Sequence, residues 1–166
     1  KNKKPRQILS GRLAPRKGEG SPGFGGAAAE NLVESAIWLI DCRGADILVV
    51  AVGDVSGKGA PAALYGAYVA ELVRSRTLRR RYTPDRFSVS GVLQTMNQIL
   101  HERQLEEYYC TLCYAFFDFE RRVLTMSNSG LPYPIRCTHD ECGQIELPGF
   151  PLGSFPGVTY DEVTIP

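Results

Sequence analysis

Residues 47–64 read ILVVAVGDVSGKGAPAAL and combine three signals of local structure. The apolar run Ile47–Gly53 predicts a β-strand that is covered on both faces. The glycines that follow it predict a loop, and Pro61 stands where a helix places proline in its first turn. The stretch therefore predicts a strand, a glycine-rich loop that contains Asp54, and a helix.

The neighbouring segments alternate between strand and helix signals. Upstream, the apolar run Leu32–Asp41 and the turn Cys42–Asp46 predict a β-hairpin with the strand just described. Downstream, helical spacing continues to the cluster Arg74–Arg81, and Thr83–Pro84 predicts the N-cap and first turn of a second helix. The apolar face of that second helix consists of Leu93, Met96 and Leu100.

After residue 107 the sequence changes to a strand pattern. The predicted strands are Tyr109–Asp118, Val123–Asn128, Ile135–Thr138 and Gln144–Leu147. On the first of them, residues 111, 113, 115 and 117 face one way and residues 110, 112, 114 and 116 the other, and both faces are apolar. Since such a strand must be covered on both sides, we expect an α+β fold with largely antiparallel pairing, one sheet packed on another and helices outside.

Composition is typical of one globular domain. The chain has 166 residues, 43% of them apolar, which is enough to bury about 70% of the unfolded surface. The net charge of +1 is uneven, because residues 1–20 carry a surplus of +6 and residues 21–166 sum to −5. We expect residues 1–31 to be a basic lead-in or linker and residues 32–166 to form the domain.

Several classes of function are disfavoured by the sequence. No apolar run approaches the ~20 residues of a membrane span, and no apolar stretch follows the basic start. The basic segment has no aromatic residue before Phe24 on which a nucleic-acid base would stack. Five cysteines, an odd number, favour free thiols in a reducing compartment. We therefore expect a cytoplasmic protein with no membrane span in this segment and no nucleic-acid ligand.

Two clusters allow more than one interpretation. The spacing of Cys110, Cys113, Cys137, Cys142 and His139 also occurs in zinc sites, but the first two cysteines face opposite sides of the predicted strand, so we expect buried free thiols. The arginine cluster complements the dipole at the end of a helix. Docking of a partner on these arginines is the alternative, and nucleic-acid binding is less favoured.

The loop around Asp54 is not a phosphate-binding P-loop. That motif requires G-x-x-x-x-G-K-[ST], whereas here the spacing from Gly53 to Gly57 is one residue short and Gly59 stands in place of the hydroxyl residue. A dinucleotide-binding G-x-G-x-x-G pattern is also absent from this loop. The chemistry must therefore be sought in another class of site.

The segment Gly53–Leu64 resembles the signature of the SpoIIE/RsbU-type branch of the PPM (protein phosphatase 2C-like) serine/threonine phosphatases. Three further segments are similar to that family in the same order: the aromatic strand Tyr109–Asp118, NSGLPYP at Asn128–Pro134 and GFPLG at Gly149–Gly153. The resemblance covers residues 32–166. It implies an α-β-β-α sandwich of two mostly antiparallel sheets flanked by helices, here without its C-terminal strands.

The resemblance implies a metal-dependent phosphatase that acts on phosphoserine or phosphothreonine. In such sites two Mg²⁺ or Mn²⁺ ions hold a bridging water and clamp the phosphoryl oxygens. Carried over by position, Asp54 is the catalytic bridging carboxylate, and the backbone carbonyl of Val55 is a further metal ligand. Lys58 is either a contact to the phosphoprotein substrate or a solvated lysine.

The sequence departs from the family pattern at its other metal positions. A strand before Asp54 normally carries a metal-binding Asp, and the equivalent position here is Ala36, with Glu34 and Asp41 as neighbouring carboxylates. The family's later metal-binding Asp would follow Pro166, where this sequence ends. Two interpretations stay open: a phosphatase domain seen in part, or a degenerate PPM-fold module that binds a regulatory partner without catalysis.

The resemblance also implies partners. The substrate would be a phosphorylated regulatory protein of the anti-anti-sigma (STAS-like) type, which dephosphorylation releases to capture an anti-sigma kinase. The segment Arg6–Pro15 is similar to a lead-in helix that connects these phosphatases to an N-terminal sensor domain. A homodimer is compatible with the sequence.

Overall fold

The computed structural model describes residues 35–42, 46–79, 88–103 and 107–166, and within them it contains two helices and seven strands. In chain order the elements are β1 (Ser35–Cys42), β2 (Ile47–Val55), α1 (Gly59–Arg79), α2 (Val89–Glu102), β3 (Cys110–Asp118), β4 (Val123–Ser129), β5 (Ile135–Cys137), β6 (Cys142–Gln144) and β7 (Val163–Ile165). Neither of the described helices combines the length and apolarity that crossing a bilayer requires.

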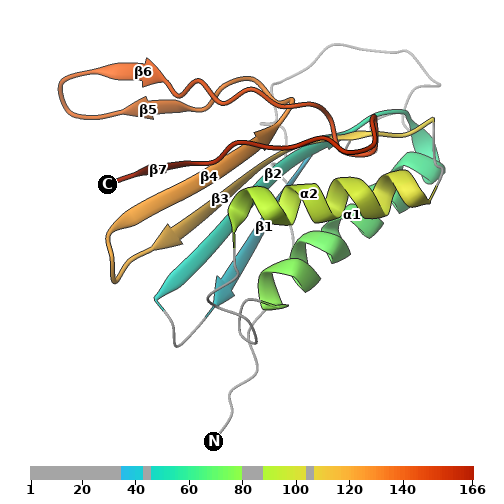
Figure 1. The fold of residues 1–166 in the computed structure, drawn as a ribbon, viewed down its shortest axis with the longest axis horizontal. Coiled ribbons are helices and arrows are strands. Elements are labelled where there is room, and N and C mark those ends of the chain that lie inside the picture. Colours follow the sequence, from blue (N-terminus) through green and yellow to red (C-terminus); the bar gives the residue numbers. More distant parts are fainter. Residues whose placement is uncertain (1–34, 43–45, 80–87, 104–106) are drawn as a thin grey trace, which may run out of the picture.

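Five strands form the main sheet in the order β1-β2-β3-β4-β7, and every neighbouring pair is antiparallel. The pairs β1–β2 and β3–β4 are hairpins, whereas β2 and β3 are joined through both helices (Figure 1). The strands β5 and β6 form a separate two-stranded sheet. The connection through α1 and α2 therefore leaves the sheet at one end of β2 and returns at the same end into β3.

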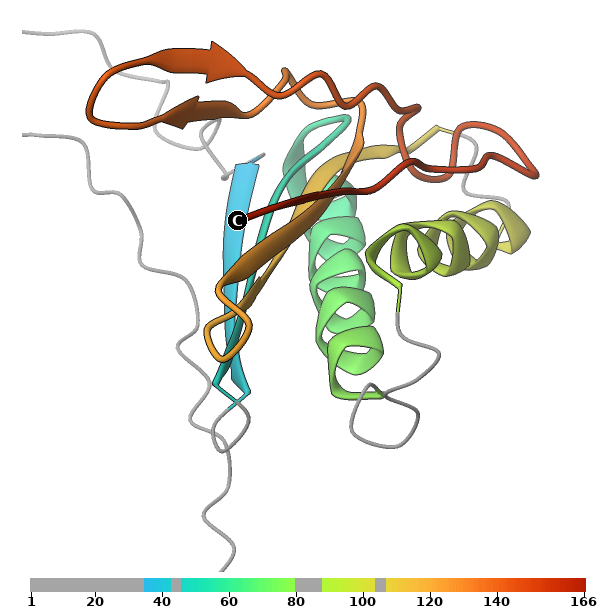
Figure 2. The same ribbon diagram turned by 60° about the vertical axis from the view of Figure 1, so that its left-hand side comes forward.

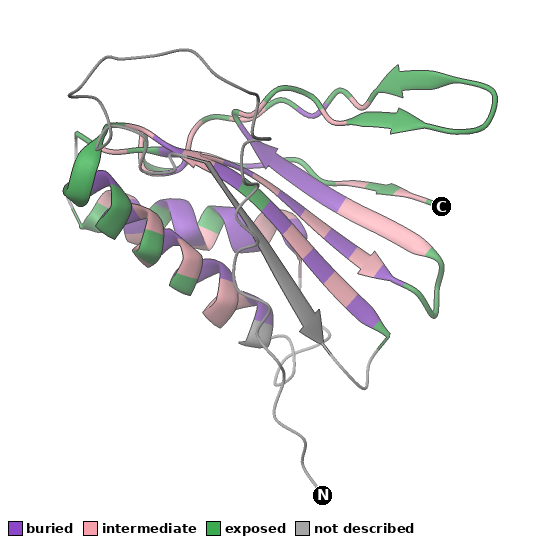
Figure 3. Cartoon of the chain, turned by 180° about the vertical axis from the view of Figure 1, so that it is seen from behind, coloured by how far each residue is buried: buried purple, intermediate pink, exposed green. Residues whose placement is uncertain are grey.

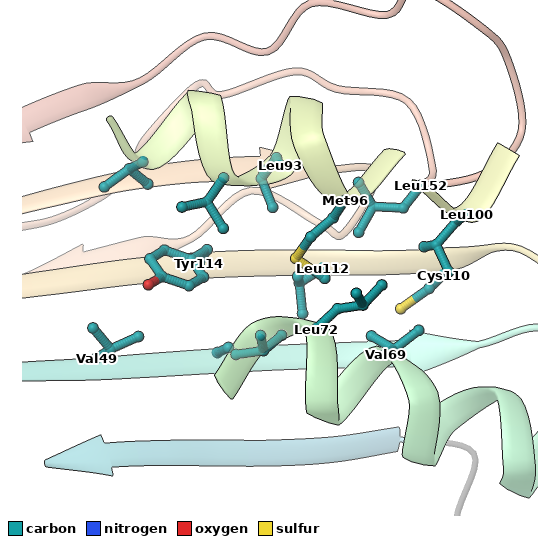
Figure 4. Close-up of a cluster of buried hydrophobic side chains, with 14 of the residues drawn as sticks. Val49, Val69, Leu72, Leu93, Met96, Leu100, Cys110, Leu112, Tyr114 and Leu152 are labelled. Carbon is teal, nitrogen blue, oxygen red and sulfur yellow. The ribbon is translucent and has the colours of Figure 1, made fainter. Parts of the chain in front are cut away.

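Both helices cover the same face of the main sheet (Figures 1 and 2). Strand residues on that face meet the inner sides of the helices in one core (Figure 4). The hydroxyls of Tyr114 and Thr77 form a hydrogen bond of 2.7 Å inside it. The hydroxyls of Tyr65 and Tyr160 are buried in the same core without a hydrogen-bond partner among the described residues. Fully buried side chains in the core include Val49, Val69, Val73, Leu93, Met96, Leu100, Leu112 and Tyr114.

The two faces of β3 differ in burial as their alternation predicts. Residues 110, 112, 114, 116 and 118 are buried, and the residues between them are half-buried, which gives the striped pattern in Figure 3. The helices cover the first face. The expected α+β class with antiparallel sheets and flanking helices is confirmed, and the second sheet among the described residues is the small β5–β6 pair.

Helix α2 begins later than its predicted cap. Its N-cap is Ser88, whose hydroxyl accepts a hydrogen bond of 3.0 Å from the backbone N–H of Gly91. The carboxylate of Glu162, 74 residues after Ser88, accepts hydrogen bonds from the Ser90 N–H at 2.8 Å and from the Ser88 hydroxyl at 3.0 Å. The prediction of Thr83 as N-cap of this helix was therefore wrong; Thr83 and Pro84 lie outside the described residues.

The expectation of free thiols is wrong for two cysteines. Cys137 and Cys142 are joined by a disulfide, because they are directly paired on β5 and β6 with Cα atoms 4.1 Å apart. The same pairing places β6 before the strand predicted at Gln144–Leu147. Cys110 and Cys113 are free, the first buried and the second half-buried.

The core assignment is tested by a matched pair of leucine substitutions. Leu93 is 0% exposed, and we expect Leu93→Ala to lower the free energy of unfolding by about 2–5 kcal/mol. The substitution removes buried apolar surface and leaves a cavity whose lining loses its packing contacts. Leu64 on α1 is 72% exposed, so Leu64→Ala should change it by less than about 0.5 kcal/mol. Urea unfolding followed by circular dichroism measures both, and equal losses would contradict this core.

Candidate functional site

Asp54 lies next to the end of β2, between a buried strand and the loop that leads to α1. It is paired with Thr111 of β3, whose hydroxyl donates a hydrogen bond of 3.4 Å to the Asp54 backbone carbonyl. Val55 is the last residue of the strand and is buried. The carboxylate is thus carried by a backbone that the sheet holds, and it is half-buried at the sheet's end.

The loop after Asp54 is tied to the start of β3 by two hydrogen bonds. The N–H of Ser56 donates to the Tyr109 carbonyl at 2.9 Å, and the Tyr109 N–H donates to the Ser56 hydroxyl at 2.8 Å. Gly57 and Gly59 have φ of +91° and +77°, values that only glycine adopts freely. These two glycines turn the chain so that α1 starts directly after the loop, and Lys58 between them is exposed.

The segment that begins at Asn128 resembles a family motif, and its side chains hydrogen-bond to the backbone of neighbouring segments. The Asn128 amide donates to the carbonyls of Leu131 at 2.8 Å and Leu147 at 3.0 Å, and its oxygen accepts from the Leu131 N–H at 3.2 Å. The Ser129 hydroxyl bonds both the N–H and the carbonyl of Leu112, at 2.8 and 3.0 Å. Since both side chains are buried with these bonds satisfied, their role is structural.

The GFPLG segment closes the same end of the sheet. Leu152 exchanges two backbone hydrogen bonds with Cys110, at 3.1 and 2.7 Å, and Cys110 is the partner of Val55. The Asn97 side chain on α2 accepts from the Gly153 N–H at 2.8 Å and donates to the Phe155 carbonyl at 2.9 Å. The three motifs that lie far apart in the sequence therefore meet around the end of β2 and β3.

Sequence reasoning did not assign a role to Asn97, although a signal was present. It lies between Met96 and Leu100 on the apolar side of α2 and is 1% exposed. A polar residue inside an apolar helix face must have hydrogen-bond partners when it is buried. That pattern predicts a side-chain bond to another segment, but not which segment supplies it.

The thiol of Cys110 lies beside Asp54 and is protonated. Burial raises its pKa to about 12, and the nearby Asp54 charge adds to this, while a backbone hydrogen bond at Asp54 opposes it. A thiol with so high a pKa is a poor nucleophile at neutral pH. Cys110 is thus a packing residue of the site.

The remaining predicted positions are placed by the register of β1. Ala36 is paired with Gly53, next to Asp54, and Ser35 is paired with Asp54 itself. Asp41 is paired with Leu48, six residues along β2 from Asp54, which corresponds to about 20 Å. Asp41 is therefore too far away to share a metal ion with Asp54. Glu34 lies outside the described residues.

Among the described residues, the donors around Asp54 are too few for a two-metal centre. Within the described ranges, no group of three or more His, Cys, Asp or Glu side chains is placed to hold a metal ion. Asp54 and the Val55 carbonyl are oxygen donors of the kind that Mg²⁺ and Mn²⁺ prefer. Two such ions need several carboxylates, so Asp54 and the Val55 carbonyl suit these ions in kind but do not by themselves make such a centre.

The fold and the motif order together define a PPM-like domain, and the comparisons with known proteins agree. The chain belongs to the SpoIIE family: the model of the family described as Stage II sporulation protein E matches residues 44–166. Comparison with curated proteins gave no match.

Several solved structures have a similar fold. The chain is similar to the PP2C phosphatase domain of SpoIIE from Bacillus subtilis, with a TM-score of 0.61 and 19% identity over 80% of this chain and 37% of that chain. It is also similar to the RsbU and RsbW domains of a Mycobacterium tuberculosis protein, with a TM-score of 0.59 and 24% identity over 86% of this chain and 37% of that chain. The structure of RsbX in complex with magnesium gives a TM-score of 0.57 and 18% identity over 79% of this chain and 66% of that chain. The chain thus spans little more than a third of the length of the first two.

A pair of glycine substitutions tests the close approach of the motifs. A Cβ at Gly149 would overlap the backbone carbonyl of Asn128, so we expect Gly149→Ala to lower the free energy of unfolding by about 3 kcal/mol or more. Gly143 on β6 has open space around its Cα, and Gly143→Ala should be close to neutral. Thermal unfolding compares the two; a neutral Gly149→Ala would mean that the loop does not lie against Asn128.

Proposed function

We propose that the chain is the Asp54-bearing part of a metal-dependent serine/threonine protein phosphatase, which hydrolyses a phosphoserine or phosphothreonine on a regulatory protein in bacterial signalling. The observation that carries this proposal is the position of Asp54 beside the end of a buried strand, immediately before the N-terminus of α1. Membership of the SpoIIE family supports the same reaction class.

The groups around Asp54 suit a phosphoryl substrate. The first N–H groups of α1 have no partners within the helix and carry the positive end of its dipole. No acidic residue occupies the first turn of α1, and Lys58 is exposed beside it. An anion at this helix end is favoured by both features. Lys58 is accordingly our candidate for contact with the phosphoprotein.

Asp54 and the Val55 carbonyl would hold Mg²⁺ or Mn²⁺, with Asp54 as the bridging ligand. When bound, such a metal pair lowers the pKa of a water molecule and stabilises charge on the phosphoryl oxygens. One carboxylate does not complete a two-metal centre, so the proposal requires further ligands outside the described residues. RsbX, a structural neighbour, was crystallised in complex with magnesium.

The proposed substrate is a phosphorylated regulator of the anti-anti-sigma (STAS-like) type. The support is indirect: one structural neighbour combines RsbU and RsbW domains, and another comes from the bacterial stressosome. A second candidate function is a degenerate module that binds such a regulator without catalysis. Alanine at position 36 favours that candidate, as does the lack, among the described residues, of a group of three or more side chains that could hold a metal ion.

Substitution of Asp54 distinguishes the two candidates. We expect Mn²⁺-dependent hydrolysis of a phosphoserine protein, and weaker hydrolysis of p-nitrophenyl phosphate, to fall by about a hundredfold or more in Asp54→Asn. Loss of a group that hydrogen-bonds to a metal ligand already costs about 10–100-fold, and loss of the ligand itself should cost more. Asp140→Asn is the matched control, since this carboxylate is exposed in the β5–β6 turn. Phosphate release measures both.

The opposite result has a defined meaning. If the protein turns nothing over with either metal, while its binding to a phosphorylated STAS-type regulator survives Asp54→Asn and a chelator, the degenerate module is correct. If turnover is present but insensitive to chelators and to Asp54→Asn, the assignment of the site is wrong.

A further inference from the structure

A groove of about 490 Å³ lies between α1 and α2, open to solvent. The two helices run side by side over the sheet in both views (Figures 1 and 2). The volume is within the range of small-ligand pockets, about 300–1,000 Å³. The groove is lined by Tyr68, Leu72, Arg76, Ile99, Glu102 and Arg103.

Arg76 on α1 has a hydrogen-bond donor, its Nε, for which the structure provides no acceptor among the described residues. Its Nε is buried, and no hydrogen-bond partner for it exists among the described residues. Two residues earlier, Arg74 donates to Glu71 from both Nε and an Nη atom, at 2.7 and 2.6 Å. Buried donors in native proteins are nearly always paired, so the Nε of Arg76 lacks an acceptor that a bound group would supply.

A second guanidinium faces the groove from α2. The Cζ atom of Arg103 lies 5.9 Å from the centre of the Tyr68 ring, a cation–π arrangement that holds the charge at the groove edge. Glu102 also lines the groove, and its Oε1 accepts a hydrogen bond of 2.8 Å from Gln98 on the surface of its own helix. Two guanidiniums against one carboxylate leave the groove with a positive charge.

The lining between the arginines is apolar. Leu72 is 6% exposed, and Tyr68 and Ile99 are partly buried hydrophobic residues that pack against the core. A guanidinium beside apolar surface recognises a carboxylate that is carried next to an apolar side chain. Simple inorganic anions would leave the apolar part uncovered.

We propose that this groove binds an acidic segment of a partner protein, in which a carboxylate accepts from Arg76 and a neighbouring apolar side chain covers Leu72. An open groove between two helices suits an amphipathic peptide. The basic residues 1–20, with a surplus of +6, have the wrong charge to be that segment. Since Arg76 is 17 residues along α1 from Gly59, about 25 Å, the groove is separate from Asp54 and does not rest on the phosphatase activity.

The test uses the full chain and a fluorescein-labelled amphipathic peptide with leucine and glutamate at helical spacing. We expect saturable binding by fluorescence anisotropy, and a loss of affinity of about tenfold or more in Arg76→Glu and in Arg103→Glu. Arg76→Lys should also weaken binding, because it keeps the charge and removes the Nε donor. The matched control is Arg121→Glu, an exposed arginine after β3, which should leave the affinity unchanged.

Several outcomes would overturn the proposal. The first is that the peptide does not bind. The second is that a peptide with glutamine in place of glutamate binds with the same affinity. The third is that Arg121→Glu lowers the affinity as much as Arg76→Glu does. Displacement of the acidic peptide by a single-stranded oligonucleotide would assign the groove to nucleic acid. Self-association that Arg76→Glu abolishes, seen by analytical ultracentrifugation without peptide, would assign it to a second copy of the chain. Circular dichroism of each variant verifies the fold.

Discussion

The antiparallel pairing of β2 with β3 is the constraint on which the Asp54 end of the molecule depends. Its register runs from Ile47 opposite Asp118 to Val55 opposite Cys110, so the two strands end together. Leu152 then extends the pairing at Cys110. A slip of one residue would turn every side chain of β2 to the other face, which would expose the core residues and move the carboxylate of Asp54. The buried face of the sheet thus determines where the candidate site lies.

The loops around Asp54 are held in place by hydrogen bonds from two asparagine side chains and by a close backbone contact that only glycine allows. Asn128 and Asn97 are each 1% exposed, and each bonds a segment distant in sequence, at Leu147 and at Gly153–Phe155. Gly149 lets the loop lie against the carbonyl of Asn128, where no side chain fits. Asn97, Asn128 and Gly149 are therefore required by the close packing of the loops that surround Asp54.

Local patterns in the sequence were sufficient to predict the strands of the two hairpins in the main sheet and both helices. The apolar alternation of β3 and the glycines before α1 act over a few residues, so their structural consequences could be predicted. The N-cap of α2 could not be predicted, because Ser88 is supported by Glu162 from 74 residues away. Strand β7 is only Val163–Ile165 and carries too few residues for a periodic signal.

The candidate site was predictable to a similar extent. Asp54, Val55 and Lys58 adjoin one strand end, and a local motif is enough to bring them together. The disulfide of Cys137 with Cys142 depends on the pairing of β5 with β6, which composition and cysteine counting do not contain. Register likewise separates Asp41 from Asp54, although both belong to the same hairpin.

The half-covered face of β2 and β3 and the need for further metal ligands beside Asp54 have a common physical explanation. The side of β2 and β3 away from the helices carries apolar residues that are only half covered, such as Cys113 and Phe117, and Val52 is 36% exposed. Burying such a face is worth about 25 cal/mol for each Å² of apolar surface, so a second layer is favoured there. In the proposed α-β-β-α sandwich that layer is the second sheet. The layer that covers Val52 would then also carry the ligands that Asp54 needs, so stability and metal binding would be completed by the same residues.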